Sequence, residues 1–215
     1  REPFEPLVPG VKFAKFNDLD SVKSLVNEKT CAIILEPLQG EGGIHLATQE
    51  FMGGIRKLCD ENDILMICDE VQCGMGRTGT MFAWQGYGVK PDILKPGDHG
   101  ATYGGNPLAC TAVKTVLSIF ERKNIVGHVN EIAPYFTEKL EELKAEFDCV
   151  TERRGKGLMQ GLVITKPIKE INDRAIEEGL LIIQAQGNVI RFVPPLIVEK
   201  EHIDQMVEKM RRILA

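Results

Sequence analysis

The chain has 215 residues, of which 43% are hydrophobic and 27% charged, a composition typical of a protein that buries a hydrophobic core. Its formal net charge of -5 argues against a nucleic acid as partner, because binding to phosphates requires clustered basic side chains. No apolar run approaches the length that spans a bilayer, so we expect no membrane partner, no signal peptide and a cytoplasmic location.

The spacing of cysteine and histidine predicts neither disulfides nor a metal site. None of the six cysteines belongs to a C-x-x-C pair, and several lie in apolar runs, as expected for reduced cysteines in a core. The four histidines also lack the spacing of metal ligands. The first residue is Arg1 rather than methionine, so we expect the chain to begin inside a longer polypeptide.

The first half of the chain predicts a β-α-β unit. Residues 31–35 form a short apolar run, typical of a parallel strand that is buried on both faces, and the glycine-rich stretch 39–43 follows it. Residues 48–62 carry apolar side chains at helical spacing, and residues 64–68 form a second strand that ends just before Asp69. Both strand ends are then expected at one edge of a parallel sheet.

The second half predicts helices followed by short strands. Asn106 as N-cap and Pro107 at the first helical position indicate a helix to about residue 121. Further elements are expected as a helix over 128–147, strands over 158–164, 180–183 and 189–193, and a last helix over 200–214. This change in pattern places residues 1–125 in part of a large α/β domain and residues 126–215 in a small α+β domain.

Asp69 is the first candidate functional residue. A carboxylate at the carboxyl end of a buried parallel strand lies where open α/β sheets bind their ligands. Residues 74–79 fit the dinucleotide fingerprint G-x-G-x-x-G, and a nucleotide-binding α/β protein is therefore one hypothesis. It is disfavoured because no crossover helix follows the motif and because a pyrophosphate would lie close to the carboxylates of Asp69 and Glu70.

Arg191 is the second candidate, since a guanidinium is rarely buried without a partner and this one stands inside the apolar run 189–193. It forms either a structural ion pair or a bidentate clamp for a substrate carboxylate. Glu41 is flanked by glycines, which predicts a mobile, solvated acid near a strand end. Thr102 precedes the helix that begins at Pro107, and such a loop can offer hydroxyl and N–H groups to a phosphate.

Four stretches together resemble the class III aminotransferases, which depend on pyridoxal 5′-phosphate (PLP). They are residues 36–43, 69–79, 99–107 and 189–195, and they occur in the order found in that family. The likeness covers essentially the whole chain. It implies an α/β PLP-transferase of fold type I, with a large domain built on a mostly parallel sheet and a small C-terminal α+β domain. It also implies a homodimer with shared active sites.

The resemblance implies that several residues bind the cofactor. Asp69 would pair with the protonated pyridine nitrogen, so that the ring acts as an electron sink. Glu70, Val71 and Gln72 follow in the same cofactor-binding stretch. Val71 would pack on one face of the ring, and Gln72 would hydrogen-bond near its phenolic oxygen. Thr102 would hold the phosphate across the dimer interface.

The resemblance also implies the substrate contacts. Arg191 would bind a substrate carboxylate, and Glu41 would neutralise Arg191 with one substrate and swing away for glutamate or 2-oxoglutarate. Ala101, where many relatives have serine, would lie at the substrate. The implied reaction moves an amino group between N-acetylornithine, or a similar ω-amino acid, and 2-oxoglutarate, as in arginine biosynthesis. Ornithine, succinylornithine and 4-aminobutyrate are alternative donors.

The sequence departs from the family at the lysine that forms the internal Schiff base. In the family this lysine lies in a glycine-rich loop after the stretch that matches residues 91–94. Here Lys95 runs directly into residues 96–99, so Lys95 is either the catalytic lysine beside a deletion or an ordinary lysine. We favour the second interpretation, in which the catalytic lysine belongs to a segment absent from the 215 residues. A catalytically inert module that keeps the fold for dimerisation or binding is the competing hypothesis.

Overall fold

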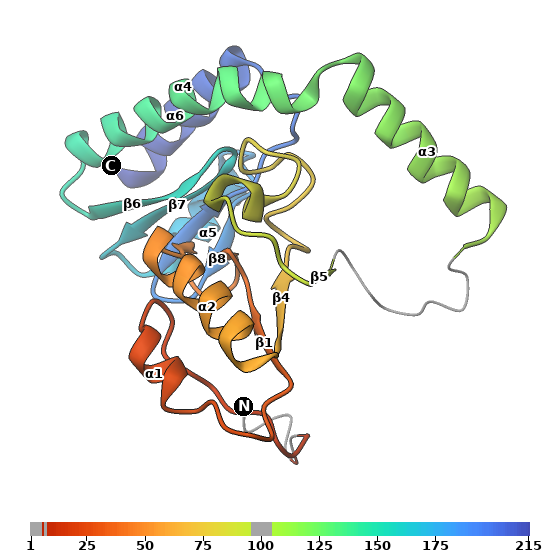
Figure 1. Ribbon diagram of the computed structural model, residues 1–215. Coiled ribbons are helices and arrows are strands. Elements are labelled where there is room, and N and C mark those ends of the chain that lie inside the picture. Colours follow the sequence, from red (N-terminus) through yellow and green to blue (C-terminus); the bar gives the residue numbers. More distant parts are fainter. Residues whose placement is uncertain (1–5, 7, 96–104) are drawn as a thin grey trace.

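The computed structural model describes residue 6 and the ranges 8–95 and 105–215 (Figure 1). Its strands form a parallel three-stranded sheet, a two-stranded antiparallel hairpin and an antiparallel four-stranded sheet. Within these ranges, none of the helices is long and apolar enough to cross a membrane. The two larger sheets supply the strand ends on which the candidate site is built.

The parallel sheet is built as the predicted β-α-β unit, with the strand order β1-β4-β5. Helix α2 (Gln49–Asn62) connects the first two strands, and the Thr48 side chain caps it by accepting a hydrogen bond from the Phe51 N–H at 3.1 Å. This cap explains why the helix begins where it does, since it satisfies a backbone donor that the first turn leaves free. The strands are β1 (Ala32–Leu35), β4 (Leu65–Asp69) and β5 (Ile93–Lys95).

Only one face of this sheet is covered, which corrects the expectation of strands buried on both faces. Helix α2 buries Met66 and Cys68 of β4 in a hydrophobic cluster. On the other face, Ile34 is 58% exposed, Leu65 45% and Ile93 39%. Successive side chains of a strand point to opposite faces, and within the described ranges the second face finds no cover comparable to α2.

A short hairpin follows β1 and carries the glycine-rich loop. It pairs β2 (Leu38–Gln39) with β3 (His45–Leu46) and holds residues 40–44 between them. Helix α1 (Leu19–Lys23) precedes β1, and the 3-10 helix η2 (Ala83–Tyr87) follows β4. The sequence predicts none of these elements, because strands of two residues and helices of five are too short to show their periods.

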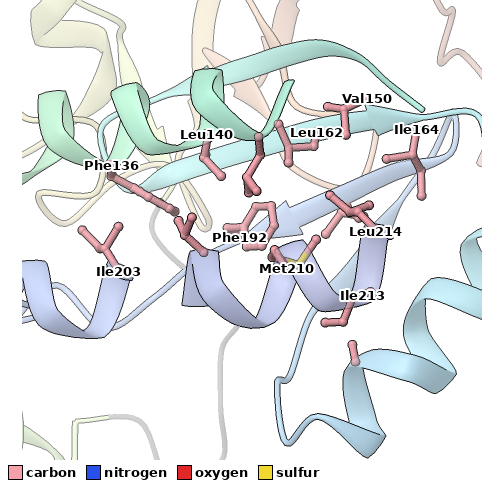
Figure 2. Close-up of a cluster of buried hydrophobic side chains, with 14 of the residues drawn as sticks. Phe136, Leu140, Val150, Leu162, Ile164, Phe192, Ile203, Met210, Ile213 and Leu214 are labelled. Carbon is pink, nitrogen blue, oxygen red and sulfur yellow. The ribbon is translucent and has the colours of Figure 1, made fainter. Parts of the chain in front are cut away.

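The antiparallel sheet has the strand order β6-β7-β9-β8 and forms the C-terminal part of the chain. Figure 2 shows Phe136 and Leu140 of α4, Phe192 of β9 and Met210 of α6 pointing into one hydrophobic cluster. Helices α4 and α6 therefore cover one face of this sheet, and α5 packs against α6. The elements are α4 (Ile125–Glu146), β6 (Val150–Lys156), β7 (Met159–Ile164), α5 (Ile168–Glu177), β8 (Ile183–Ala185), β9 (Val189–Phe192) and α6 (Lys200–Leu214).

A third hydrophobic cluster lies on the opposite face of the antiparallel sheet and joins the two parts of the chain. It contains Leu38 and Ile44 of the hairpin, Cys73 of the turn after β4, and Met159 and Val189 of the sheet. The hairpin and the turn after β4 therefore pack directly against the antiparallel sheet. The division of the chain at residues 125/126 stays a prediction.

Helix α3 (Pro107–Arg122) projects from the rest of the chain (Figure 1) and contains no buried residue. The Asn106 side chain accepts a hydrogen bond from the Ala109 N–H at 2.9 Å, which confirms the predicted N-cap. The side chains of Leu108 and Val113 are 80% and 59% exposed. The helix thus presents apolar side chains that the described chain leaves uncovered.

The elements predicted for the second half are confirmed with one exception. Helix α6 spans the predicted residues, and α4 begins three residues before the predicted start. The strand predicted over 180–183 is wrong, because Leu180 and Ile182 pack on the hydrophobic cluster without pairing and only 183–185 pair with β9. Strand β6 and helix α5 are additional elements that the sequence analysis does not contain.

Replacing Leu140 by alanine is expected to destabilise the fold by about 2–5 kcal/mol, because Leu140 is fully buried in the cluster of Figure 2 and its removal leaves a cavity. The matched control is Leu181→Ala: Leu181 is 91% exposed, and its loss is expected to change the free energy of unfolding by less than about 0.5 kcal/mol. Urea unfolding followed by circular dichroism measures both. Equal effects of the two substitutions would contradict this assignment of the core.

Candidate functional site

Asp69 lies at the carboxyl edge of the parallel sheet, as predicted. It is the last residue of β4, and its backbone pairs in register with that of Lys95, the last residue of β5. The Oδ1 atom of Asp69 accepts a hydrogen bond from the Val71 N–H at 3.1 Å, which begins the turn that follows. Ligands of open α/β sheets bind at this edge, so the half-buried carboxylate of Asp69 is available to one.

Glu70 points away from this edge and is buried, with 2% of the residue exposed. Its Oε2 atom accepts a hydrogen bond from the Ala83 N–H at 2.6 Å, and its Oε1 atom accepts one from the Trp84 N–H at 2.8 Å. Burial raises the pKa of Glu70, while these two N–H groups act in the opposite direction. Because both carboxylate oxygens bind the start of η2, Glu70 fixes the turn after Asp69; a cofactor contact for it stays a prediction.

Asp69 and Val71 together suit a flat heterocycle that carries a proton. Val71 is 61% exposed and stands two residues after the carboxylate. An apolar side chain can pack on the face of a ring while a carboxylate accepts a hydrogen bond from a ring N–H. These residues therefore fit the pyridine ring of PLP. The predicted phosphate and substrate contacts at Thr102 and Ala101 lie outside the described residues.

Arg191 is buried and joins two other predicted site residues. It lies in β9 and is 6% exposed. Its Nη1 atom lies 2.8 Å from Oε1 of Glu41 and donates a hydrogen bond to Oε1 of Gln72 at 2.7 Å. The fold thus brings together the hairpin loop, the turn after β4 and a strand of the second sheet.

The two ends of the ion pair differ in exposure. The side chain of Arg191 is 7% exposed, whereas that of Glu41 is 69% exposed. A buried cation requires a partner, but an exposed carboxylate gains little from a single pair and can leave it. The Nε atom of Arg191 is also buried and has no hydrogen-bond partner among the described residues. The pair is therefore one that an incoming carboxylate can replace.

Hydrogen bonds anchor the backbone of the Glu41 loop, and the mobility expected of Glu41 stays a prediction for its side chain. The Gln186 N–H donates to the carbonyl oxygen of Glu41 at 3.0 Å, and Nη1 of Arg154 donates to that of Gly43 at 3.1 Å. A Cβ atom on Gly43, where φ is +108°, would lie 2.8 Å from the carbonyl oxygen of Gln186. The glycine therefore permits close approach to the second sheet, and the freedom that remains is in the Glu41 side chain.

Glu36 adds a carboxylate that the sequence analysis does not single out. Its Oε2 atom accepts a hydrogen bond from the Gly40 N–H at 3.1 Å. Burial raises the pKa of Glu36, and the nearby carboxylates of Asp69 and Glu41 raise it further, whereas the Gly40 N–H and the positive charge of Arg191 lower it. These carboxyl groups and Arg191 therefore share one electrostatic environment. The position of Glu36 directly after β1 is the signal that indicates it.

Arg77 is a second residue beyond the predicted set, and it connects the two sheets. Its Nη1 atom donates to the carbonyl oxygen of Pro194 at 2.5 Å, and its own carbonyl oxygen accepts a hydrogen bond from the Leu158 N–H at 2.9 Å. A Cβ atom on Gly157 would lie 2.3 Å from that carbonyl oxygen. Because Pro194 closely follows β9, Arg77 ties the turn after β4 to the strand that carries Arg191. The sequence signal for it is an arginine inside a glycine-rich turn.

The pattern of the family described as Aminotransferase class-III matches residues 1–95 and 93–214 of the chain. The chain is 42% identical over 236 residues to the acetylornithine aminotransferase of Aquifex aeolicus. The aligned region covers 98% of this chain and 61% of that protein. The chain thus spans about three fifths of the length of the curated relatives that it matches.

Two solved structures show the same fold. The N-acetylornithine aminotransferase of Stenotrophomonas maltophilia superposes with a TM-score of 0.84 at 33% identity. The superposed region covers 94% of this chain and 61% of that enzyme's chain. An ornithine aminotransferase from Toxoplasma gondii, described with partial occupancy of PLP at its active site, has a TM-score of 0.89 at 27% identity and covers 98% and 57%. The predicted fold class is confirmed by these likenesses.

Replacing Glu70 by alanine is expected to destabilise the chain by about 1–3 kcal/mol at neutral pH, because the backbone N–H groups of Ala83 and Trp84 both lose their acceptor. Glu61→Ala is the matched control, since the Glu61 side chain is 59% exposed. Urea unfolding monitored by Trp84 fluorescence measures both variants, and equal losses would contradict the role of Glu70.

The effect of Glu70→Ala also has a defined pH dependence. Because the pKa of Glu70 is raised above 4.5 in the folded chain, the folded state holds this proton more tightly than the unfolded state. The stability that protonated Glu70 contributes is present below pH 4.5 and is lost as the pH rises through the raised pKa. The difference in unfolding free energy between the unaltered chain and the variant is therefore expected to shrink over that range, and a difference that grows with pH would contradict the argument.

Proposed function

Because the chain belongs to the class III aminotransferases, we propose that it forms the catalytic part of a transaminase acting on N-acetylornithine, or a similar ω-amino acid, and 2-oxoglutarate. The observation that carries this proposal is the buried Arg191, paired with the exposed Glu41 beside the sheet edge that ends in Asp69. The names of two similar proteins support acetylornithine as donor. Ornithine, succinylornithine and 4-aminobutyrate are alternative donors. The acetylornithine reaction would belong to arginine biosynthesis in the cytoplasm.

PLP is the proposed cofactor, since the residues at the sheet edge fit its ring. When bound, PLP supplies an electron sink for the electron pair released as the C–H bond beside the substrate's amino group breaks. Asp69 would accept a hydrogen bond from the ring nitrogen and so hold a proton at that atom. Val71 would cover one face of the ring. Gln72 and Thr102 would contact the phenolic oxygen and the phosphate.

Arg191 and Glu41 would let one pocket accept two substrates in turn. With the ω-amino donor in place, Glu41 keeps the guanidinium of Arg191 neutralised. With 2-oxoglutarate, the substrate carboxylate replaces Glu41 and forms a charge-assisted pair with Arg191. Because the backbone of the Glu41 loop is held by Gln186 and Arg154, this exchange requires only rotation of the Glu41 side chain.

The lysine that attaches the cofactor is proposed to lie outside these 215 residues rather than at Lys95. In support, the family pattern matches the chain in two segments that meet at residues 93–95, as expected where a loop is absent. The same break supports the competing candidate, an inert module that keeps the fold for dimerisation or binding.

A homodimer with shared active sites is part of the proposal. Leu108 and Val113 of α3 are more than half exposed, and apolar side chains of this kind favour a contact with another chain. The contact of Thr102 with the phosphate across the dimer interface, which the family resemblance implies, belongs to this proposal.

Incubation of the full polypeptide with PLP, followed by reduction with borohydride, is expected to label a lysine on a peptide absent from the 215 residues. Peptide mass spectrometry identifies the labelled residue. Label on Lys95 would contradict this assignment and indicate a rearranged site. Complete absence of label would favour the inert module.

Asp69→Ala is expected to lower the rate of transamination by about 10²–10³-fold or more, because the ring nitrogen loses its carboxylate partner. Since Asp69 lies at the half-buried strand end, the circular dichroism spectrum should be unchanged. Steady-state kinetics and circular dichroism test this together. Near-normal turnover in the variant would contradict the proposed role of Asp69.

Arg191→Ala is expected to lower kcat/KM for 2-oxoglutarate by about 10–100-fold, since hydrogen bonds to charged groups contribute about 1.5–3 kcal/mol. Arg153→Ala is the matched control: Arg153 also lies in the second sheet, but its ion pair is with Glu141 of α4. Unchanged kinetics of Arg191→Ala with both substrates would show that Arg191 does not bind the substrate carboxylate.

A further inference from the structure

We propose that Gln72 is a positioning residue that holds Arg191 in place as its neutral partner, so that Arg191 stays available to a substrate carboxylate when Glu41 leaves. This inference rests on the proposed function of Arg191. It adds to the contact with the phenolic oxygen of the ring that the family resemblance implies for Gln72. The arrangement of three side chains and one glycine supports it.

Gln72 contacts both members of the ion pair. Its Oε1 atom accepts a hydrogen bond from Nη1 of Arg191 at 2.7 Å, and its Nε2 atom donates to Oε1 of Glu41 at 3.4 Å. The same Nη1 atom lies 2.8 Å from Oε1 of Glu41. The amide orientation follows from its neighbours, because the reverse orientation would turn an NH2 group towards the guanidinium and an oxygen towards the carboxylate.

The space for this amide is created by a missing side chain. A Cβ atom on Gly40 would lie 2.2 Å from Oε1 and 2.8 Å from Nε2 of Gln72. The Gly40 N–H is itself held by Oε2 of Glu36 at 3.1 Å, so the backbone cannot retreat without breaking that hydrogen bond. Gly40 therefore gives the amide of Gln72 a built place between Arg191 and Glu41.

The neutrality of Gln72 determines what it can do. If Glu41 turned away and no other acceptor were present, Nη1 of the buried Arg191 would lose its partners, which is unfavourable for a charged donor. Gln72 remains as an acceptor, yet it leaves the positive charge of Arg191 uncompensated. An additional carboxylate in this position would instead pair with Arg191 permanently and compete with the substrate.

The consequence is that the place of the carboxylate matters, and not only the net charge. The Glu41 side chain is 69% exposed and can rotate, whereas the amide of Gln72 is packed against Gly40. A carboxylate at position 41 can yield to the substrate, but one at position 72 cannot. Exchanging the two side chains keeps the composition and charge of the site and reverses which position is free to move.

Binding of glutarate, a dicarboxylate without a keto group, tests this inference by isothermal titration calorimetry. Gln72→Glu is expected to weaken the binding at least tenfold relative to the unaltered chain, and Glu41→Gln is expected to bind at least as tightly. The exchanged variant Glu41→Gln with Gln72→Glu is expected to stay at least tenfold weaker. In the complete enzyme, Gln72→Glu should lower kcat/KM for 2-oxoglutarate at least tenfold more than kcat/KM for the donor.

A second variant keeps the test decisive if Gln72→Glu does not fold. Gln72→Met removes the acceptor without adding a charge and is expected to weaken the binding of glutarate about threefold to tenfold. Thermal unfolding followed by Trp84 fluorescence verifies the fold of each variant. Binding by the exchanged variant that equals that of the unaltered chain would overturn the inference, because charge alone would then suffice.

The outcomes also separate this inference from the proposed function. An unaltered chain that binds glutarate with the expected variant pattern but shows no transamination in the complete polypeptide would leave the role of Gln72 standing and refute the proposed reaction. Failure of the unaltered chain to bind glutarate, or equal binding by Gln72→Glu, would overturn the inference itself.

Discussion

The burial of one guanidinium is the constraint on which the arrangement around the site depends. Arg191 is 6% exposed in β9, so its charge requires acceptors from elsewhere in the chain. Glu41 and Gln72 supply them from the hairpin loop and from the turn after β4. Each of these segments is in turn attached to the second sheet, the hairpin loop through Gln186 and the turn through Arg77. An apolar cluster packs the hairpin and the turn after β4 against the antiparallel sheet beside these polar links.

Much of the fold follows from local signals in the sequence. Thr48 and Asn106 cap the helices that begin after them, and the apolar runs of β4 and β9 are strands. Strand β6 is different, because a run that contains Glu152 and Arg154 has no clear alternation of apolar residues. Its charged side chains form ion pairs with each other and with α4, and those partners are known only once the fold is known. The same holds for β8, whose position depends on pairing with β9.

Some features of the candidate site could likewise be predicted from the sequence, and others could not. The position of Asp69 could be predicted, since the end of a parallel strand in a β-α-β unit has a defined place. The burial of Arg191 could also be predicted from the apolar residues beside it. The hydrogen bond from Arg191 to Gln72 could not, because it spans 119 positions in the sequence and depends on how two sheets meet. The anchoring of the Glu41 loop could not be predicted either, because Gln186 and Arg154, which bind its backbone, lie far away in the sequence.

The glycines at 40, 43 and 157 also limit how such a site can change through evolution. Each lies where even a methyl group would come within 3 Å of a backbone or side-chain atom of a neighbouring segment, so random replacement there damages the site before it can alter its preference. Exposed side chains near the sheet edge, such as Val71, have no comparable restriction. Substitutions at such exposed positions therefore alter the walls around the site at little cost, whereas substitutions at these glycines disturb the segments that hold Arg191.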